Sequence, residues 1–272
     1  MKENVKEYYE KEASVYNEEF YLKREEYPTL RYRHNYILHM ISEISLPDTA
    51  KILDVGCGPG EMIKDLAKHN WKIYGVDIAK EMVEIASERI NPELLNKGQV
   101  VIGEGDIENL QFEDDLFDVI ICSGVIEYLK DDILWLKEIS RVLKTNGYLI
   151  INITNKYSVR KWTTPFVEFI KSKKNIYNAL NFVKEKILHK GKLHYFPFRS
   201  RVHSPNGFDN YMYKNNFQKI KHHYFDFAIF PAPFDTLLSF FTTPLRKKME
   251  YLSEKNMLIN GTGYLVLYKK KN

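Results

Sequence analysis

The stretch Lys51–Gly60, KILDVGCGPG, decides the fold expected for this chain. Apolar residues surround Asp54, and glycines follow at positions 56, 58 and 60, directly before a helical pattern that begins at Glu61. A short buried strand that enters a helix through a glycine-rich turn is the layout in which a ligand lies beyond the carboxyl ends of parallel strands. Glycines so closely spaced indicate that this ligand approaches the backbone itself.

The same alternation of strand and helix continues after the turn. Apolar runs at 72–77, 98–106, 117–124 and 148–154 predict strands, and helical patterns lie at 79–90 and 130–144. Such alternation predicts a mostly parallel sheet with helices on both faces. Residues 3–43 have a helical pattern that Pro28 interrupts. A capped helix at 204–216 and strands at 217–228 and 261–271 complete the expected α/β fold.

Two kinds of ligand compete for the glycine turn. A nicotinamide dinucleotide would need the spacing G-x-G-x-x-G and a helix N-terminus that accepts a pyrophosphate. Here the spacing is G-x-G-x-G, and the acid Glu61 takes the place of the third glycine of that pattern. We expect Glu61 and Asp54 to repel a pyrophosphate, so a cationic ligand without phosphate is favoured.

The string ILDVGCGPG resembles the first motif of the class I S-adenosylmethionine-dependent methyltransferases, in particular those that act on small molecules and lipids. The resemblance covers residues 45–155 and extends more loosely into the C-terminal part. It implies a Rossmann-like, seven-stranded, mostly parallel sheet, with S-adenosylmethionine as cofactor and S-adenosylhomocysteine as product. This cofactor carries a sulfonium and no phosphate, in agreement with the acids around the turn. No metal site is expected.

The resemblance also implies which residues bind the cofactor. Asp77, at the end of the second strand, would accept both ribose hydroxyls, and Asp106, after the third strand, would accept from the adenine amine. Tyr16 would close over the cofactor, and Arg33 would meet the methionine carboxylate unless it lies on a solvated helix face. The other implied contacts are Asp54, Gly56, Cys57, Gly58 and Gly60 in the turn, Ile78, Met82 and Ile107 around the adenine, and Ser123 and Gly124 at the methyl end.

Candidate catalytic residues follow the fourth strand and precede the helix at 204–216. Methyl transfer is an in-line displacement in which the enzyme aligns the nucleophile, and a general base is needed only when the acceptor is protonated, as a hydroxyl is. Residues 123–126 read SGVI and lack the Asn/Asp-Pro-Pro-aromatic motif of adenine N-methyltransferases. Tyr128 replaces a histidine that small-molecule methyltransferases often carry. Glu127 and Tyr128 are therefore candidates to orient the acceptor, and His203 is the candidate base, with structural roles as the alternative for each.

The acceptor itself is expected to be a small molecule, a sugar or a lipid-like compound, methylated on O, N or C. Residues 155–204 mix basic and aromatic side chains and form the expected acceptor-side insertion. This insertion could be a lid over an acidic or phosphorylated acceptor, a peripheral membrane contact, or a solvated hairpin that dimerises. The alternatives for the whole chain are a methyltransferase acting on RNA or protein, and a catalytically silent cofactor-binding regulatory protein.

Composition sets the remaining expectations. The 272 residues divide into an N-terminal helical cap (1–45), the cofactor-binding core (46–154), the insertion (155–204) and a C-terminal part of the core (205–272). A net charge of +4 is mild, so DNA is not an expected partner, and both a monomer and a homodimer stay open. Cys57 and Cys122 have no metal spacing and indicate reduced core residues. With neither a signal peptide nor a membrane-spanning apolar run, a cytoplasmic protein is expected, with peripheral membrane contact as the alternative.

Overall fold

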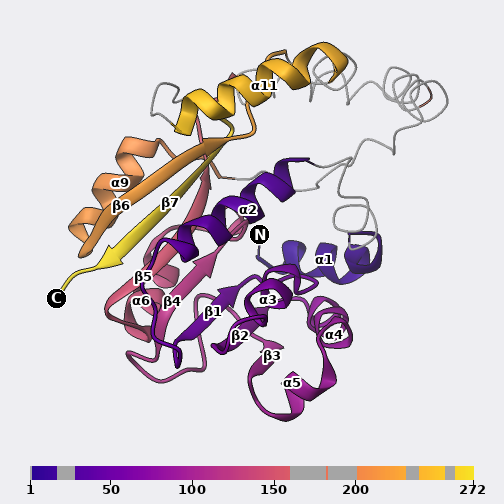
Figure 1. The fold of residues 1–272 in the computed structure, drawn as a ribbon, viewed down its shortest axis with the longest axis vertical. Helices are drawn as coiled ribbons and strands as arrows, with labels where there is room; N and C mark the ends of the chain where they lie inside the picture. Colours follow the sequence, from indigo (N-terminus) through magenta and orange to yellow (C-terminus); the bar gives the residue numbers. More distant parts are fainter. Residues whose placement is uncertain (1, 17–27, 160–181, 183–200, 231–238, 255–260) are drawn as a thin grey trace.

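The computed structural model describes residues 2–16, 28–159, 182, 201–230, 239–254 and 261–272, and every structural statement below refers to these residues. Within them, a seven-stranded sheet is covered by helices (Figure 1). The strands are β1 Lys51–Val55, β2 Lys72–Asp77, β3 Val100–Glu104, β4 Phe117–Cys122, β5 Leu143–Thr154, β6 Phe217–Phe225 and β7 Gly263–Lys270. The strand order across the sheet is β3-β2-β1-β4-β5-β7-β6.

The sheet is mostly parallel. β1 to β5 pair in parallel, whereas β7 runs antiparallel to both of its neighbours, β5 and β6. The central strands are apolar without interruption because both of their faces are covered: Ile52, Leu53, Ile120 and Ile121 have no exposed surface. The predicted Rossmann-like, seven-stranded, mostly parallel sheet is confirmed.

The helices agree with most of the sequence predictions. They are α1 Lys2–Tyr16, α2 Pro28–Ser42, α3 Glu61–Leu66, α4 Lys80–Arg89, α5 Pro92–Asn96, the 3₁₀ helix η2 Ile126–Tyr128, α6 Ile133–Val142, α9 Pro205–Lys214 and α11 Ser239–Glu254. Pro28 begins α2, a position where its missing N–H costs nothing. Ser204 caps α9 by accepting from the Gly207 N–H at 3.1 Å. The helix predicted over 130–144 ends at Val142, because β5 already begins at the next residue.

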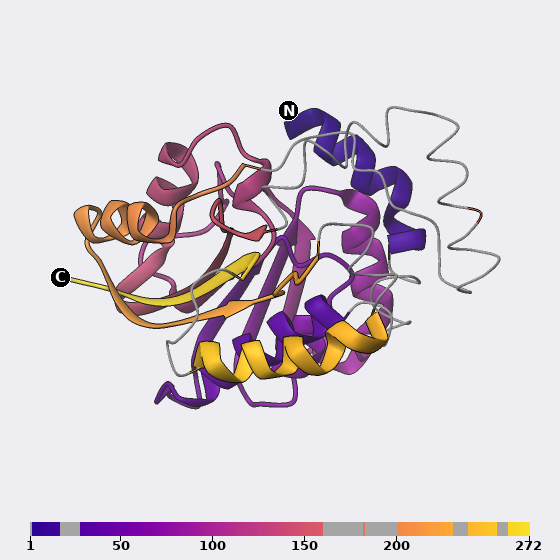
Figure 2. The same ribbon diagram turned by 90° about the horizontal axis from the view of Figure 1, so that it is seen from above.

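Two apolar cores lie on opposite faces of the sheet. On one face, Trp135 of α6 and Phe208 of α9 pack against the strands; on the other, Ile37 of α2 and Ile63 of α3 do so. Figure 2 shows α11 and α9 on opposite sides of the sheet. Because both faces are covered, the open positions for a ligand are the ends of the strands.

The functional end of the sheet is set by the position of β1. β1 pairs with β2 on one side and with β4 on the other, so the strand order changes direction at β1. The carboxyl ends of β1, β2 and β4 therefore frame a crevice, which is where ligands bind in open α/β sheets.

The predicted division of the chain stays a prediction. The expected N-terminal cap corresponds to α1 and α2, and α1 packs on α4. Of the expected insertion at 155–204, the structure describes residues 155–159, 182 and 201–204. The three interpretations of this insertion, as a lid, a membrane contact or a dimerising hairpin, therefore concern residues that lie largely outside the described part. No helix in the described ranges is long and apolar enough to cross a membrane.

Candidate functional site

The glycine turn after β1 requires its glycines for backbone conformation and for space. Gly56, Gly58 and Gly60 have φ angles of 70°, 51° and 80°, in the left-handed region that favours glycine. A Cβ on Gly56 would lie 2.3 Å from a methyl carbon of Val125. The turn is anchored to β2, because the N–H groups of Gly56 and Cys57 both donate to the Val76 carbonyl, at 2.8 and 3.1 Å. The backbone therefore enters the crevice in a defined path.

Asp77 ends β2 beside this turn. Its carboxylate accepts from the N–H of Gly58 at 2.9 Å and from the N–H of Ala79 at 3.0 Å. Burial raises the pKa of Asp77, and these backbone donors oppose the shift. The predicted contact with the ribose hydroxyls stays a prediction. The structure adds that the same carboxylate holds the glycine turn against β2.

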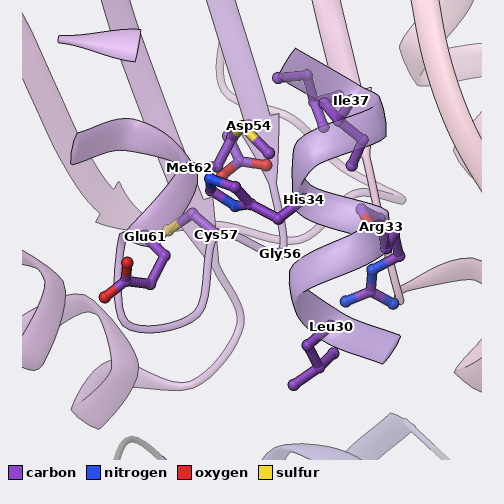
Figure 3. A pocket seen from close by; sticks show the side chains of 11 residues that line it. Leu30, Arg33, His34, Ile37, Asp54, Gly56, Cys57, Glu61 and Met62 are labelled. Carbon is purple, nitrogen blue, oxygen red and sulfur yellow. The ribbon is translucent and has the colours of Figure 1, made fainter. Parts of the chain in front are cut away.

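A pocket lies between α2 and the glycine turn. Figure 3 shows Leu30, Arg33, His34 and Ile37 along α2, and the His34 side chain reaches from this helix toward Asp54 of β1 and Met62 of α3. Ser123, after β4, closes the pocket, and its buried hydroxyl oxygen has no hydrogen-bond partner among the described residues. His34 is held in place by Asp65 of α3, with the imidazole Nε2 2.7 Å from a carboxylate oxygen.

An acidic and a basic side chain, Asp54 and Arg33, line this pocket. Asp54 is 4% exposed and accepts no hydrogen bond from the described residues. Burial and the neighbouring Asp77 raise the pKa of Asp54 to about 8, and only Arg33 acts against the shift. Arg33 makes no hydrogen bond or ion pair with the described residues, and its guanidinium lies against Gly124, 3.2 Å from where a Cβ would be. A buried acid and a nearby base without protein partners suit a ligand that carries both an ammonium and a carboxylate.

The role expected of Glu61 needs correction. Its carboxylate is buried and forms an ion pair with Arg89 of α4, which also donates to the Pro59 carbonyl at 3.0 Å. Because Arg89 balances its charge, Glu61 does not itself repel a phosphate, and the pair instead ties α4 to the turn. Uncompensated acids near the turn remain at Asp54 and Asp77. The sequence gives no signal for this pair, because 28 residues separate its partners.

The adenine side of the expected site is built from α4, α1 and the turn after β3. Met82 is 2% exposed and packs against Ala13 of α1, so the N-terminal helix covers this side. Asp106 accepts from the Glu108 N–H at 3.0 Å, a turn contact that uses one carboxylate oxygen. Ile107 is buried in the core, and Ile78 is partly buried. The adenine contacts of these residues stay predictions. Tyr16 ends α1, but its side chain lies outside the described part of the structure.

The end of β4 carries the residues expected near the methyl group. The Gly124 N–H donates to the side-chain oxygen of buried Asn152 at 2.8 Å, which fixes the turn that follows β4. Glu127 is buried in η2, and the Tyr128 hydroxyl lies 3.5 Å from the hydroxyl of Tyr9 on α1. Asn152 and Tyr9 were not indicated by the sequence, because neither stands in a recognisable spacing.

The predicted base, His203, lies beside η2 rather than in the cofactor pocket. Its Nε2 atom is 3.0 Å from a carboxylate oxygen of Asp132, which Arg201 also contacts. The backbone N–H of Arg201 donates to the Glu127 carbonyl at 2.7 Å. The structure thus brings His203 and Glu127 to one edge of the sheet and adds Asp132 and Arg201, which sequence reasoning missed.

Comparisons with known proteins agree with this geometry. Residues 53–151, from β1 into β5, match the family model described as "Methyltransferase domain". Residues 53–151 form a class I methyltransferase domain. The matched range contains the glycine turn, Asp77, Asp106 and the end of β4. S-adenosylmethionine is the cofactor of such a domain, and the unpartnered Arg33, Asp54 and Ser123 fit its charged methionine end.

Individual relatives share this methyltransferase domain. The putative methyltransferase YqeM of Bacillus subtilis is 31% identical over 121 residues, covering 43% of this chain and 47% of the relative. A ubiquinone biosynthesis O-methyltransferase of Coxiella burnetii is 30% identical over 105 residues, covering 39% of this chain and 44% of the relative. This chain therefore spans less than half the length of these relatives. The magnesium protoporphyrin IX methyltransferase ChlM of Synechocystis, solved with bound SAH, has a TM-score of 0.61 at 14% identity, covers 98% of both chains and shows the shared fold.

Proposed function

We propose that this protein transfers a methyl group from S-adenosylmethionine to an O, N or C atom of a small-molecule, sugar or lipid-like acceptor. The observation that carries the proposal is an acid and a base, Asp54 and Arg33, that lack hydrogen-bond partners among the described residues and line one pocket together with Ser123. A dinucleotide offers no ammonium to Asp54, whereas a methionine group offers an ammonium to Asp54 and a carboxylate to Arg33. The relative named as a ubiquinone biosynthesis O-methyltransferase supports a small-molecule acceptor.

Each part of the site has a task in this reaction. Arg33 binds the carboxylate of the cofactor, and Asp54 binds its ammonium, directly or through water. Asn152 holds the turn at Gly124, so that the wall beside the reacting centre does not move. When bound, the cofactor supplies an activated methyl group, and the protein contributes alignment and the exclusion of water. Glu127 and Tyr128, which follow Gly124 in the chain, orient the acceptor in this proposal.

Binding measurements test the cofactor assignment. Isothermal titration calorimetry should show saturable binding of S-adenosylmethionine and S-adenosylhomocysteine and none of NADH. Arg33→Ala should weaken cofactor binding by about 10- to 100-fold, since a lost hydrogen bond to a charged group costs about 1.5–3 kcal/mol. Arg31→Ala is the matched control, because Arg31 lies on the same helix but is exposed. Equal affinities in the two variants would exclude the proposed role of Arg33.

Transfer of a labelled methyl group tests the acceptor class. The protein is incubated with methyl-labelled cofactor and fractions of a cell extract, and the labelled product is separated by size. Label in a low-molecular-weight product is the expected result. Label on RNA or protein would contradict the acceptor class, and tight cofactor binding without any labelled product would favour a regulatory protein.

A further inference from the structure

The segment Arg201–His203 is tied to the edge of the sheet where the acceptor is expected. The His203 N–H donates to the Thr154 carbonyl at 2.9 Å, and the Lys156 N–H donates to the His203 carbonyl at 3.0 Å. These bonds continue β5 beyond its end. Together with the bond from Arg201 to the Glu127 carbonyl, they place His203 between the ends of β4 and β5.

Asp132, the residue before α6, organises the side chains of this segment. The Arg201 guanidinium donates to both carboxylate oxygens, at 3.1 and 2.7 Å, and the Trp135 indole donates at 3.0 Å. The donors from His203, Arg201 and Trp135 hold the pKa of Asp132 well below its usual range, against the effect of burial. Asp132 is therefore an ionised carboxylate at neutral pH and acts as an acceptor only.

This charge decides the tautomer of His203. Nε2 lies 3.0 Å from the Asp132 oxygen and 3.2 Å from Nη2 of Arg201, and one of the two N–H groups of this Nη2 donates to the same Asp132 oxygen at 2.7 Å. A lone pair on Nε2 would face the carboxylate lone pairs, so we assign the proton to Nε2, where it is donated to Asp132. The lone pair of the ring then lies on Nδ1.

Nδ1 of His203 is buried and has no hydrogen-bond partner among the described residues. The His203 side chain is 11% exposed, and its ring meets the edge of Phe208 of α9 at 5.2 Å between centroids. In the described part of the chain, the charged side chains in contact with His203 are Asp132 and Arg201. A buried acceptor without a donor destabilises the folded state. The contact with Asp132 uses the other nitrogen, so the lone pair of Nδ1 is not engaged by it.

We propose that Nδ1 of His203 is the general base of the reaction and that the group it serves is a hydroxyl of the acceptor. This inference rests on the proposed methyl transfer. As the hydroxyl oxygen forms its bond to the methyl carbon, the bond from that carbon to sulfur breaks, and its electron pair stays on sulfur. The hydroxyl proton moves to Nδ1, and Asp132 stabilises the imidazolium that results. A neutral amine acceptor would not need this base for its attack.

His223 shows that an unpaired ring nitrogen alone does not make a base. It is also a buried histidine whose Nε2 has no hydrogen-bond partner among the described residues, but its ring lies tilted against Tyr36, with 3.6 Å between centroids. Burial and the nearby cations lower the pKa of His223 to about 4, so its imidazole is a poor proton acceptor at neutral pH. His203 differs because a carboxylate faces its ring.

Nuclear magnetic resonance tests the tautomer without any enzymatic activity. The protein is labelled with ¹⁵N-histidine, and the His203 signals are assigned by their loss in His203→Gln. At neutral pH, with S-adenosylhomocysteine added, the expected signals are a protonated Nε2 and an unprotonated Nδ1. A protonated Nδ1 would overturn the proposal whether or not an acceptor is known.

Kinetics with a matched set of phenols, alcohols and amines tests the chemistry. His203→Gln keeps a donor toward Asp132 but has no basic lone pair, and His69→Gln, at an exposed histidine, is the control. The methyl group should be found on hydroxyl oxygens, and His203→Gln should lower kcat/KM by about 100- to 10,000-fold. This variant should also lose the rise of kcat/KM with pH while its cofactor affinity is unchanged.

The failures of the two proposals are distinguishable. Absence of cofactor binding in the wild-type protein would count against the proposed function. Methylation of amines alone, or an unchanged pH profile in His203→Gln, would count against His203 as the base and leave methyl transfer standing.

Discussion

Asp54 is the group whose charge works against folding, and its replacement gives the sharpest test of the site. Its carboxyl is 4% exposed, and burial with the neighbouring Asp77 raises its pKa from 3.8 to about 8. The native state therefore binds this proton more tightly than the unfolded chain does. The resulting stability is complete below pH 3.8 and is lost as the pH rises toward 8. Each pH unit corresponds to about 1.4 kcal/mol, so from about pH 5 to about pH 7.5 the loss is about 3 kcal/mol.

Asp54→Asn removes this titration. Urea unfolding without cofactor, at about pH 5 and about pH 7.5, should show that the free energy of unfolding falls by about 3 kcal/mol more in the wild type than in the variant. Asp48→Asn, at an exposed aspartate before β1, controls for the loss of one carboxylate. The same fall in wild type and Asp54→Asn would refute the reasoning. At the higher pH the variant should also bind S-adenosylmethionine about 10- to 100-fold more weakly, because the ammonium favours ionisation of Asp54, whereas an amide cannot ionise.

Three further perturbations have defined outcomes. Gly56→Ala should lower the free energy of unfolding by about 1–3 kcal/mol, because φ is positive and the new Cβ would lie 2.3 Å from a Val125 methyl carbon. Adding Val125→Ala should restore part of this loss in urea unfolding, and no restoration would argue against the clash. Because burial lowers the pKa of His223 from 6.5 to about 4, the wild type should lose up to about 3 kcal/mol as the pH falls through this range. His223→Phe should reduce that loss of stability. The test compares the urea unfolding midpoints of wild type and variant above pH 6.5 and below about pH 4. Asp77→Ala should weaken S-adenosylmethionine binding by about 100-fold or more in calorimetry, since the carboxylate also holds the Gly58 N–H at 2.9 Å. Unchanged affinity would contradict the assignment of Asp77 to the cofactor.

Most of the fold could be predicted because its signals are local. The apolar runs, the glycine turn and the caps at Pro28 and Ser204 each act over a few residues. The prediction that the helix over 130–144 continues to Lys144 was wrong at its C-terminal end. The helix ends at Val142, because Leu143 pairs with Phe117 in the sheet and this pairing outweighs the helical pattern.

The positions of the candidate residues at strand ends could be predicted, and the contacts that join distant segments could not. Gly56, Asp54 and Asp77 come directly after or within strands, so the parallel sheet brings them to one edge. The charge of Glu61 was misread, because its partner Arg89 lies on another helix.

The sequence by itself determined the kind of fold and the kind of cofactor. KILDVGCGPG specifies a strand, a left-handed glycine turn and a helix, and these are decided by backbone sterics and by residues near one another in the chain. Only the tertiary structure decided which charges are balanced and which are left for a ligand. Asp132 and His203 are 71 residues apart, and no spacing relates them until the sheet places the ends of β4 and β5 side by side. The same packing removes water from Asp54 and leaves it, with Arg33, facing the pocket. Burial and partnership set the pKa and reactivity of a side chain, and both arise only when distant segments pack.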